Sequence, residues 1–293
     1  MSMKPRALQT KIFLDSGDAL ETKRAIDALG FLDGQTTNPS LVVQNPRIQD
    51  IIQSGRLLSQ SEALDVYKTI IQDISGLIPH GSVSIEVPVE TEDTVEMLTH
   101  MGKEMFAWIP NAHIKYPLIP RGIDAAQRLV SDGMRVNMTL CFTQEQAAIV
   151  HMATRGAHKG DVFVSPFLGR LHDLGLNDTD LIQNCQDMFA KNQSHVEILA
   201  ASIRDIEHFM QMLSLKVDCI TAPLHVLESW AQLGMPLPDT VIQHATDGFA
   251  PIPAKDIDLS GDWHDISSQH SLTDAGMIRF QKDWRTLTET PNQ

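Results

Sequence analysis

Seven short stretches of the chain each carry a polar or reactive residue at the point where a buried strand would end. One such side chain at the end of each strand is how a β/α barrel builds an active site, because the carboxyl ends of its strands open on one face. We therefore predict a barrel with a site on that face. The candidate residues are Asp15 in FLDS, Asn38 in TTNPS, Glu86 in SIEVP, Lys115 in HIKYP, Asn137 and Thr139 in VNMTL, Ser165 and Arg170 in SPFLGR, and Ser202 and Arg204 in AASIR.

Lys115 is the most informative of these residues. An ammonium group in an apolar, strand-like segment is costly unless it is paired or deprotonated, and a lysine with a lowered pKa is a carbonyl nucleophile. The alternation in HIKY places Lys115 on one face of a strand, and Pro117 then ends that strand. We therefore interpret Lys115 as a Schiff-base lysine. The alternative is a lysine at a strand edge that discourages aggregation.

Two carboxylates also follow apolar runs, Asp15 after FL and Glu86 after VSI. Burial there would raise their pKa toward the range of a general acid or base. Asp15 could instead cap a helix that begins near Asp18. Asn38 precedes a proline and could simply shape a turn.

Two arginines follow the predicted sixth and seventh strands. Arg170 comes after Ser165, and Arg204 comes after Ser202. This placement resembles a bidentate phosphate clamp, and barrels commonly bind phosphate near their final strands. A lone surface arginine would carry no such meaning.

Other catalytic motifs are absent from the sequence. There is no GxGxxG after a strand, no GxxxxGK[ST], no HExxH and no GxSxG, and the 12 histidines are scattered. No metal-ligand set stands out, so we expect neither a metal nor another cofactor.

Composition limits the partners and the compartment. The 293 residues carry a formal charge of -14, which disfavours a nucleic-acid partner. Cys141, Cys185 and Cys219 are far apart and lack CxxC spacing, which favours a reducing cytoplasm over a disulfide framework or a zinc site. There is no signal-like apolar region and no stretch of about 18 apolar residues. We therefore expect a cytoplasmic protein without a membrane segment.

Short apolar runs alternate with segments of helical periodicity, which is typical of βα units around a parallel sheet. Eight strands would make an α/β fold of the (β/α)8 TIM-barrel type. The expected strands are Ile12–Asp15, Gly34–Thr37, Val83–Val87, either Phe106–Ile109 or His113–Tyr116, Arg135–Leu140, Asp161–Ser165, Val196–Ala200 and Cys219–Thr221. The expected helices are Asp18–Leu29, Arg47–Ile74, Thr91–Met101, Gly122–Asp132, Thr143–Arg155, Asp178–Asn192, Ile206–Leu215 and Leu224–Leu233.

The last sixty residues differ in character. Met235–Ser271 contains several prolines, glycines and aspartates without a strong period, and Leu272–Leu287 is amphipathic again. The segment has too few apolar residues for a core of its own. We therefore expect one domain over 1–293, with the barrel at about 11–233 and a loop-rich extension with a closing helix at 234–293.

Together these motifs resemble the transaldolase family, from about residue 11 to the helix after Thr221. Seven motifs in the right order are far more specific than any one of them, and the closing FQKDW is similar as well. The resemblance implies a class I aldolase barrel with its lysine on the fourth strand, where Lys115 falls. The motifs are FLDSGD, DGQTTNPSLV, IEVP, IKYPLIPRGIDA, NMTLCFT, SPFLGRLHD and AASIRD.

The resemblance also implies a role for each residue. Lys115 would form a Schiff base with the ketone of a sugar phosphate. Asp15 would take the C4 hydroxyl proton, releasing an aldose phosphate and leaving a dihydroxyacetone enamine on the lysine. Glu86 and Thr139 would hold a water that shuttles protons. The other implied contacts are Asn38, Asn137 and Ser165 to the dihydroxyacetone hydroxyls, and Arg170, Ser202 and Arg204 to the phosphate.

Two reactions share this scaffold. Transaldolases of the pentose phosphate pathway pass the three-carbon unit of sedoheptulose 7-phosphate or fructose 6-phosphate to another aldose phosphate, whereas fructose-6-phosphate aldolases release it as dihydroxyacetone. Those aldolases carry Gln and Tyr at the water site, but this chain has Glu86 and Phe167, together with a transaldolase-like Asn137. Because Phe167 cannot donate a proton to the enamine, we favour transfer.

Several alternatives stay open. Tyr116 stands beside the lysine where the family usually has a small aliphatic residue, and the next stretch reads PLIPRG. These departures leave the donor and the acceptor open, including a different sugar phosphate. A barrel that only binds sugar phosphate or a protein partner, and a metal-dependent aldolase, are further hypotheses. Family members often self-associate through outer helices, so a homo-oligomer is a further alternative.

Overall fold

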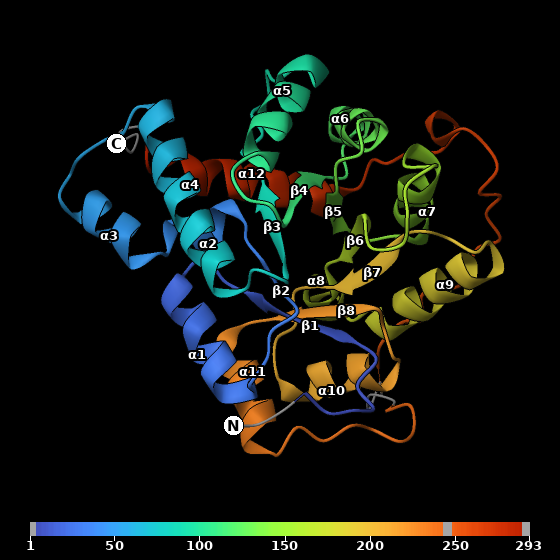
Figure 1. The fold of residues 1–293 in the computed structure, drawn as a ribbon. Helices are drawn as coiled ribbons and strands as arrows, with labels where there is room; N and C mark the ends of the chain where they lie inside the picture. Colours follow the sequence, from blue (N-terminus) through green and yellow to red (C-terminus); the bar gives the residue numbers. More distant parts are fainter. Residues whose placement is uncertain (1–3, 243–247, 289–293) are drawn as a thin grey trace.

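The computed structural model describes residues 4–242 and 248–288. In this part of the chain, eight parallel strands follow one another around a closed barrel, and helices surround it (Figure 1). Pairing of β1 with β8, in the register Ile12 to Ile220, closes the ring. The strands are β1 Lys11–Asp15, β2 Gly34–Thr36, β3 Ser82–Glu86, β4 Ala112–Pro117, β5 Val136–Cys141, β6 Val162–Pro166, β7 Glu197–Ala200 and β8 Cys219–Ala222.

The helices alternate with the strands. They are α1 Ala19–Leu29, α2 Pro39–Val43, α3 Pro46–Gln53, α4 Gln60–Leu77, α5 Val95–Phe106, α6 Pro120–Ser131, α7 Gln144–Ala153, α8 Leu168–Asp173, α9 Asp178–Lys191, α10 Ile206–Ser214, α11 Leu224–Gln232 and α12 Ser271–Arg285. Among the described residues between α11 and α12, the regular structure is one 3-10 turn, Trp263–Asp265. None of the described helices is both long and apolar enough to cross a membrane.

The predicted TIM barrel with a closing helix is therefore confirmed, with one open choice decided and one helix corrected. Of the two candidates for the fourth strand, His113–Tyr116 is correct, because Phe106 ends α5. The single helix expected over Arg47–Ile74 is wrong. It is two helices, α3 and α4, because Gly55 takes a left-handed backbone conformation (φ 71°) and Ser59 starts α4 with a capping box.

The barrel interior is layered. On β1, alternate residues point inward: Phe13 lies in an apolar layer with Phe163 of β6, and Asp15 lies above it toward the carboxyl end. The two phenyl rings meet edge to face with centroids 5.8 Å apart. On β4, His113 stacks on Phe163 at 4.4 Å, and Lys115 is the next inward residue. This apolar floor lies beneath the polar side chains at the barrel mouth.

The closing helix α12 lies across the carboxyl end of the barrel, beside α2 and β5 (Figure 1). The hydroxyl of Thr273 donates to the carbonyl of Leu140 at 2.9 Å, and the ring of Trp284 lies 5.7 Å from that of Tyr67 on α4. Gly276 permits this approach, because a Cβ there would lie 2.6 Å from the Leu140 side chain. The extension therefore caps the mouth of the barrel.

Replacing Gly276 with alanine tests this close approach. We expect Gly276→Ala to lower the free energy of unfolding by about 1 to 3 kcal/mol, because the added Cβ would force the fully buried Leu140 side chain to shift within the packed core. Gly76→Ala is the matched control: Gly76 lies in α4, a Cβ there would meet nothing within 4 Å, and the change should stabilise by up to about 1 kcal/mol. Urea denaturation measures both. Equal stabilisation in the two variants would contradict the packing described.

Candidate active site

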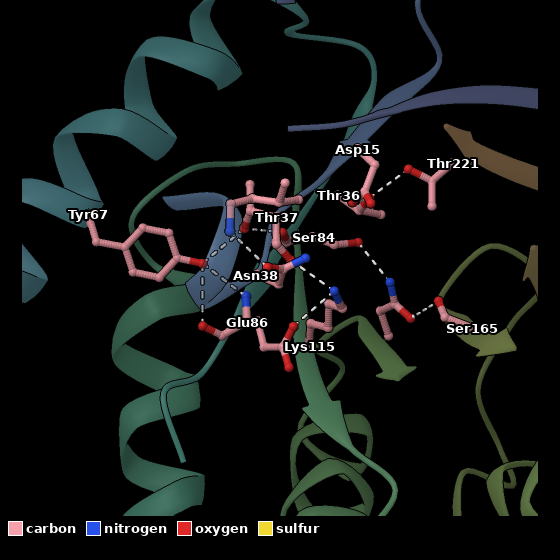
Figure 2. Close-up of polar contacts among 12 residues, drawn as sticks. Asp15, Thr36, Thr37, Asn38, Tyr67, Ser84, Glu86, Lys115, Ser165 and Thr221 are labelled. Carbon is pink, nitrogen blue, oxygen red and sulfur yellow. Dashed lines mark hydrogen bonds and ion pairs between the residues drawn. The ribbon is translucent and has the colours of Figure 1, made fainter. Parts of the chain in front are cut away.

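The barrel mouth gathers charged side chains around Lys115. Its ammonium Nζ pairs with Glu86 Oε2 at 2.9 Å and donates a hydrogen bond to the carbonyl of Thr37 at 2.9 Å (Figure 2). Both charged side chains are almost fully buried, Lys115 at 3% exposure and Glu86 at 2%. Strand register places Lys115 between Glu86 on β3 and Asn137 on β5. A buried ammonium thus faces the barrel interior instead of a sheet edge.

Asp15 supplies a second carboxylate at the end of β1. Its Oδ1 accepts a hydrogen bond from the hydroxyl of Thr36 at 2.7 Å, and Thr36 in turn lies 2.6 Å from the hydroxyl of Thr221 (Figure 2). Asp15 keeps some exposure at the mouth, yet burial is deep enough to raise its pKa, and the charge of Lys115 offsets part of that rise. The helix-cap alternative is wrong, because Asp18 caps α1.

Glu86 responds to the same environment. Burial raises the pKa of its carboxyl, the charge of Lys115 lowers it, and the negative charge of Asp15 raises it further. Its Oε2 has the Lys115 ion pair but no hydrogen bond of good geometry, and the buried hydroxyl of Thr139 on β5 also has no partner among the described residues. One ammonium therefore lies among two carboxyls whose pKa burial raises, an arrangement suited to moving protons.

A hydrogen-bond network crosses the interior beside the lysine. The amide Nδ2 of Asn137 donates to the hydroxyl of Ser84 at 3.0 Å, and the hydroxyl of Ser165 donates to Asn137 Oδ1 at 2.7 Å. Because both ends of the Asn137 amide are held, its orientation is fixed. Asn38 is the N-cap of α2, where its Oδ1 accepts from the amide of Leu41 at 2.9 Å. Asn38 therefore caps a helix, and any contact with a ligand would fall to its Nδ2.

The two arginines and Ser202 lie together at the ends of β6 and β7. A Cβ on Gly169 would lie 2.3 Å from Arg204 Nε and 2.9 Å from Ser202 Oγ, so only glycine fits beside these side chains at the position before Arg170. Arg204 pairs with Asp173 at 2.7 Å. Ser202 has a left-handed backbone conformation (φ 61°), which costs about 1 to 3 kcal/mol and is typical of functional sites.

In the sequence, Phe167 lies between Lys115 and Arg170. Its ring lies 5.9 Å from the guanidinium of Arg170 and 6.1 Å, nearly edge on, from the ring of Phe142. The side chain is a hydrocarbon with no proton to donate. It contributes shape and a cation–π contact to Arg170.

Tyr116 points away from the site. Its hydroxyl donates to the carbonyl of Leu98 on α5 at 2.7 Å, and Gly102 makes room for it, since a Cβ there would lie 2.0 Å from that hydroxyl. Neighbouring residues of a strand face opposite sides, so Tyr116 packs in the helical layer while Lys115 faces the interior. Tyr116, which stands where the family usually has a small aliphatic residue, therefore fits in the layer of helices outside the barrel and does not enter the site.

The structure adds residues that the sequence did not single out. Period-2 alternation could have found Thr36 on β2 and Ser84, which shares an inward face with Glu86. Thr37 follows Thr36 in the TTNPS motif, and its hydroxyl faces the other way, toward Tyr67. Tyr67 gives no such signal, because it lies in the middle of an amphipathic helix. Its hydroxyl accepts from the Glu86 amide at 3.1 Å and lies 2.9 Å from the hydroxyl of Thr37. It thus joins the ends of β2 and β3 from outside the barrel (Figure 2).

No group of three or more His, Cys, Asp or Glu side chains is placed to hold a metal ion in the described part of the chain. The chemistry available at this mouth is that of an amine nucleophile, two carboxyls and a nearby cationic cluster. Such a set is suited to a carbonyl compound with an anionic group.

Comparison with known proteins agrees with this site. Residues 12–290 match the family model described as transaldolase/fructose-6-phosphate aldolase. The chain belongs to this family. A probable transaldolase of Dehalococcoides mccartyi is 32% identical over 277 residues, which cover 94% of this chain and 99% of that protein. A probable transaldolase of Cereibacter sphaeroides is 34% identical over 281 residues, which cover 96% and 98%.

Among solved structures, 3-hexulose-6-phosphate synthase from Salmonella typhimurium covers 78% of this chain and 100% of its own, with a TM-score of 0.49 and 12% identity. This distant similarity carries no information on function.

The raised pKa of Asp15 predicts a pH-dependent effect on stability. Below the unfolded pKa, near 4, the carboxyl is protonated in both states; as pH rises through the folded pKa, the buried group must ionise and the fold loses stability. Asp15→Asn lacks this loss. We therefore compare the free energy of unfolding of Asp15→Asn with that of the unsubstituted protein by urea denaturation at each pH. The difference, variant minus unsubstituted protein, should rise between pH 4 and pH 8.

Glu62 provides a control of opposite sign. Hydrogen bonds from Ser59 and Arg56 lower the pKa of this exposed carboxyl, so its contribution is present above the unfolded pKa and is lost as pH falls. Glu62→Gln should be less stable than the unsubstituted protein at pH 7 and should approach it at low pH. A pH-independent difference for Asp15→Asn would contradict the assigned environment.

Proposed function

We propose that this protein is a transaldolase, which transfers a dihydroxyacetone unit from a ketose phosphate to an aldose phosphate through a Schiff base on Lys115. One observation carries the proposal: the buried Lys115 ammonium lies 2.9 Å from Glu86 at the mouth of a barrel of this family, near a second carboxyl. Fructose 6-phosphate and sedoheptulose 7-phosphate are the proposed donors. The proposed setting is the cytoplasmic pentose phosphate pathway.

The first step is attack by Lys115 on the ketone. The amine must lose its proton to become a nucleophile, and Glu86, whose pKa burial raises, is in position to take it. The neutral Nζ then bonds to the C2 carbon, and the carbonyl oxygen leaves as water after it is protonated. Glu86 and Thr139 are the proposed holders of the water that carries these protons, since both have an oxygen without a hydrogen bond.

The second step breaks the bond between C3 and C4. Asp15 takes the proton of the C4 hydroxyl, the C4 oxygen becomes a carbonyl, and the electron pair of the broken bond moves into the iminium. The aldose phosphate leaves and the enamine stays on Lys115. Transfer is the reverse sequence with another aldose phosphate. Asp15 is suited to this role because burial favours its protonated form while Lys115 stabilises its charge.

The remaining residues are proposed to bind substrate. Asn137 is oriented by Ser84 and Ser165, so it presents fixed polar atoms to the donor hydroxyls. Asn38 is proposed to act through its Nδ2. Arg170, Ser202 and Arg204 are proposed to bind the phosphate, because they cluster around Gly169 near the last strands.

Release of free dihydroxyacetone, as in the aldolases of this family, is the second candidate. Transfer is favoured because Phe167 has no hydroxyl with which to protonate the enamine. Protonation by water would make release a slow side reaction. A different sugar phosphate as donor is the remaining alternative.

Borohydride trapping tests the proposal. The protein is incubated with fructose 6-phosphate and borohydride, with and without erythrose 4-phosphate, and the modified peptide is mapped by mass spectrometry. We expect a three-carbon adduct on Lys115 that disappears when the acceptor is added, because transfer empties the enamine. Lys115→Met should give no adduct, whereas Lys191→Met, at an exposed lysine, should behave like the unsubstituted protein.

Two other results would decide against this scheme. An adduct that persists with the acceptor, accompanied by free dihydroxyacetone, would favour the aldolase reaction. No adduct with either fructose 6-phosphate or sedoheptulose 7-phosphate would contradict Schiff-base transfer from these donors.

A further inference from the structure

A third guanidinium lies near the arginine pair at the barrel mouth, and it comes from the closing helix. Arg170 Nη1 donates to the carbonyl of Leu272 at 3.3 Å, and a Cβ on Gly276 would lie 3.1 Å from the same nitrogen. Arg279 lies less than one turn further along α12 from Gly276. The helix therefore brings Arg279 to the edge of the cluster formed by Arg170 and Arg204.

The electrostatics of Arg170 report this proximity. Burial lowers the pKa of its guanidinium first, and the positive charges of Arg279 and Arg204 lower it further. The negative charge of Asp173 offsets only part of this effect. Two further guanidinium groups thus act on Arg170 in a chain whose formal charge is -14. Such a cluster is stabilised when an anion binds among its members.

The pairing of Arg279 leaves it able to engage an anion. Its Nε pairs with Asp283 at 3.8 Å, and Asp283 is itself held by a hydrogen bond from the hydroxyl of Ser40. The Arg279 side chain is 63% exposed. Arg285, on the same helix, differs because it is bound to Glu90 through two nitrogens. A weak, exposed ion pair of this kind is worth at most about 1 kcal/mol and is readily exchanged.

We propose that Arg279 is a third binding residue for the phosphate of the sugar substrate, so that α12 completes the site built by Arg170, Ser202 and Arg204. The inference rests on the proposed function, because it assumes a phosphorylated sugar at this mouth. Arg279 would contact the anionic group alone, since the reacting carbons lie at Lys115. Its effect should therefore fall on binding of the phosphate and not on the chemical steps.

Steady-state kinetics with two donors test this role. For Arg279→Gln we expect the KM for fructose 6-phosphate to rise about 10-fold or more, the loss of one charge-assisted hydrogen bond, with kcat within about twofold. The KM for unphosphorylated fructose should not change. Arg279→Lys should recover part of the loss. Lys282→Gln is the matched control, since Lys282 is exposed on the same helix, and it should behave like the unsubstituted protein.

Direct binding of inorganic phosphate, measured by calorimetry, separates this inference from the proposed function. The inference is supported if the Kd for phosphate rises about 10-fold in Arg279→Gln and does not rise in Lys282→Gln. This support would stand even if no donor gave a borohydride adduct, because the missing adduct would defeat only the transaldolase proposal. Unchanged phosphate affinity, or an equal rise in KM for both fructose 6-phosphate and fructose, would overturn it, because the residue would then be irrelevant or merely structural.

Discussion

The rest of this structure depends on keeping an ammonium group inside a protein. Removing one charge from water costs several kcal/mol, and a partner repays this only with good geometry and further hydrogen bonds. Lys115 meets these conditions through the Glu86 carboxylate and the carbonyl of Thr37, each at 2.9 Å. The same burial raises the pKa of Glu86 and of Asp15. The burial that makes the lysine costly therefore also changes the titration of the two carboxyls beside it.

The layers outside the barrel hold this arrangement in place. Tyr67 of α4 joins the backbone of Glu86 to the hydroxyl of Thr37, so one side chain aligns the partners of Lys115 on two strands. Trp284 of α12 packs against Tyr67, and the Ser40 hydroxyl after β2 donates to Asp283 of the same helix. The closing helix thus covers the mouth of the barrel, and its contacts with Tyr67 and Ser40 reach the residues that surround the partners of Lys115.

The opposite end of the site is built on tight backbone contacts. Gly169 lets the backbone before Arg170 approach Ser202 and Arg204 closely, and Ser202 itself takes a left-handed conformation that serine rarely adopts. Leu140 has the same conformation (φ 58°) at the irregular end of β5, where it meets α12. These strained points are held by their surroundings, and they fix polar groups that a relaxed chain would present elsewhere.

The sequence by itself determined the fold class and the approximate positions of the strands, with two candidates left for the fourth, and it placed Lys115 on one face of a strand, because period-2 alternation and apolar runs are local properties of the chain. It could not place Tyr67, whose partners are 19 and 30 residues away, nor bring Arg279 near Arg170. The sequence pattern also predicted one helix where the structure has two, α3 and α4. Only the tertiary structure decided these points, since contacts between distant segments depend on how helices pack around the closed barrel and leave no periodic trace in the residues that make them.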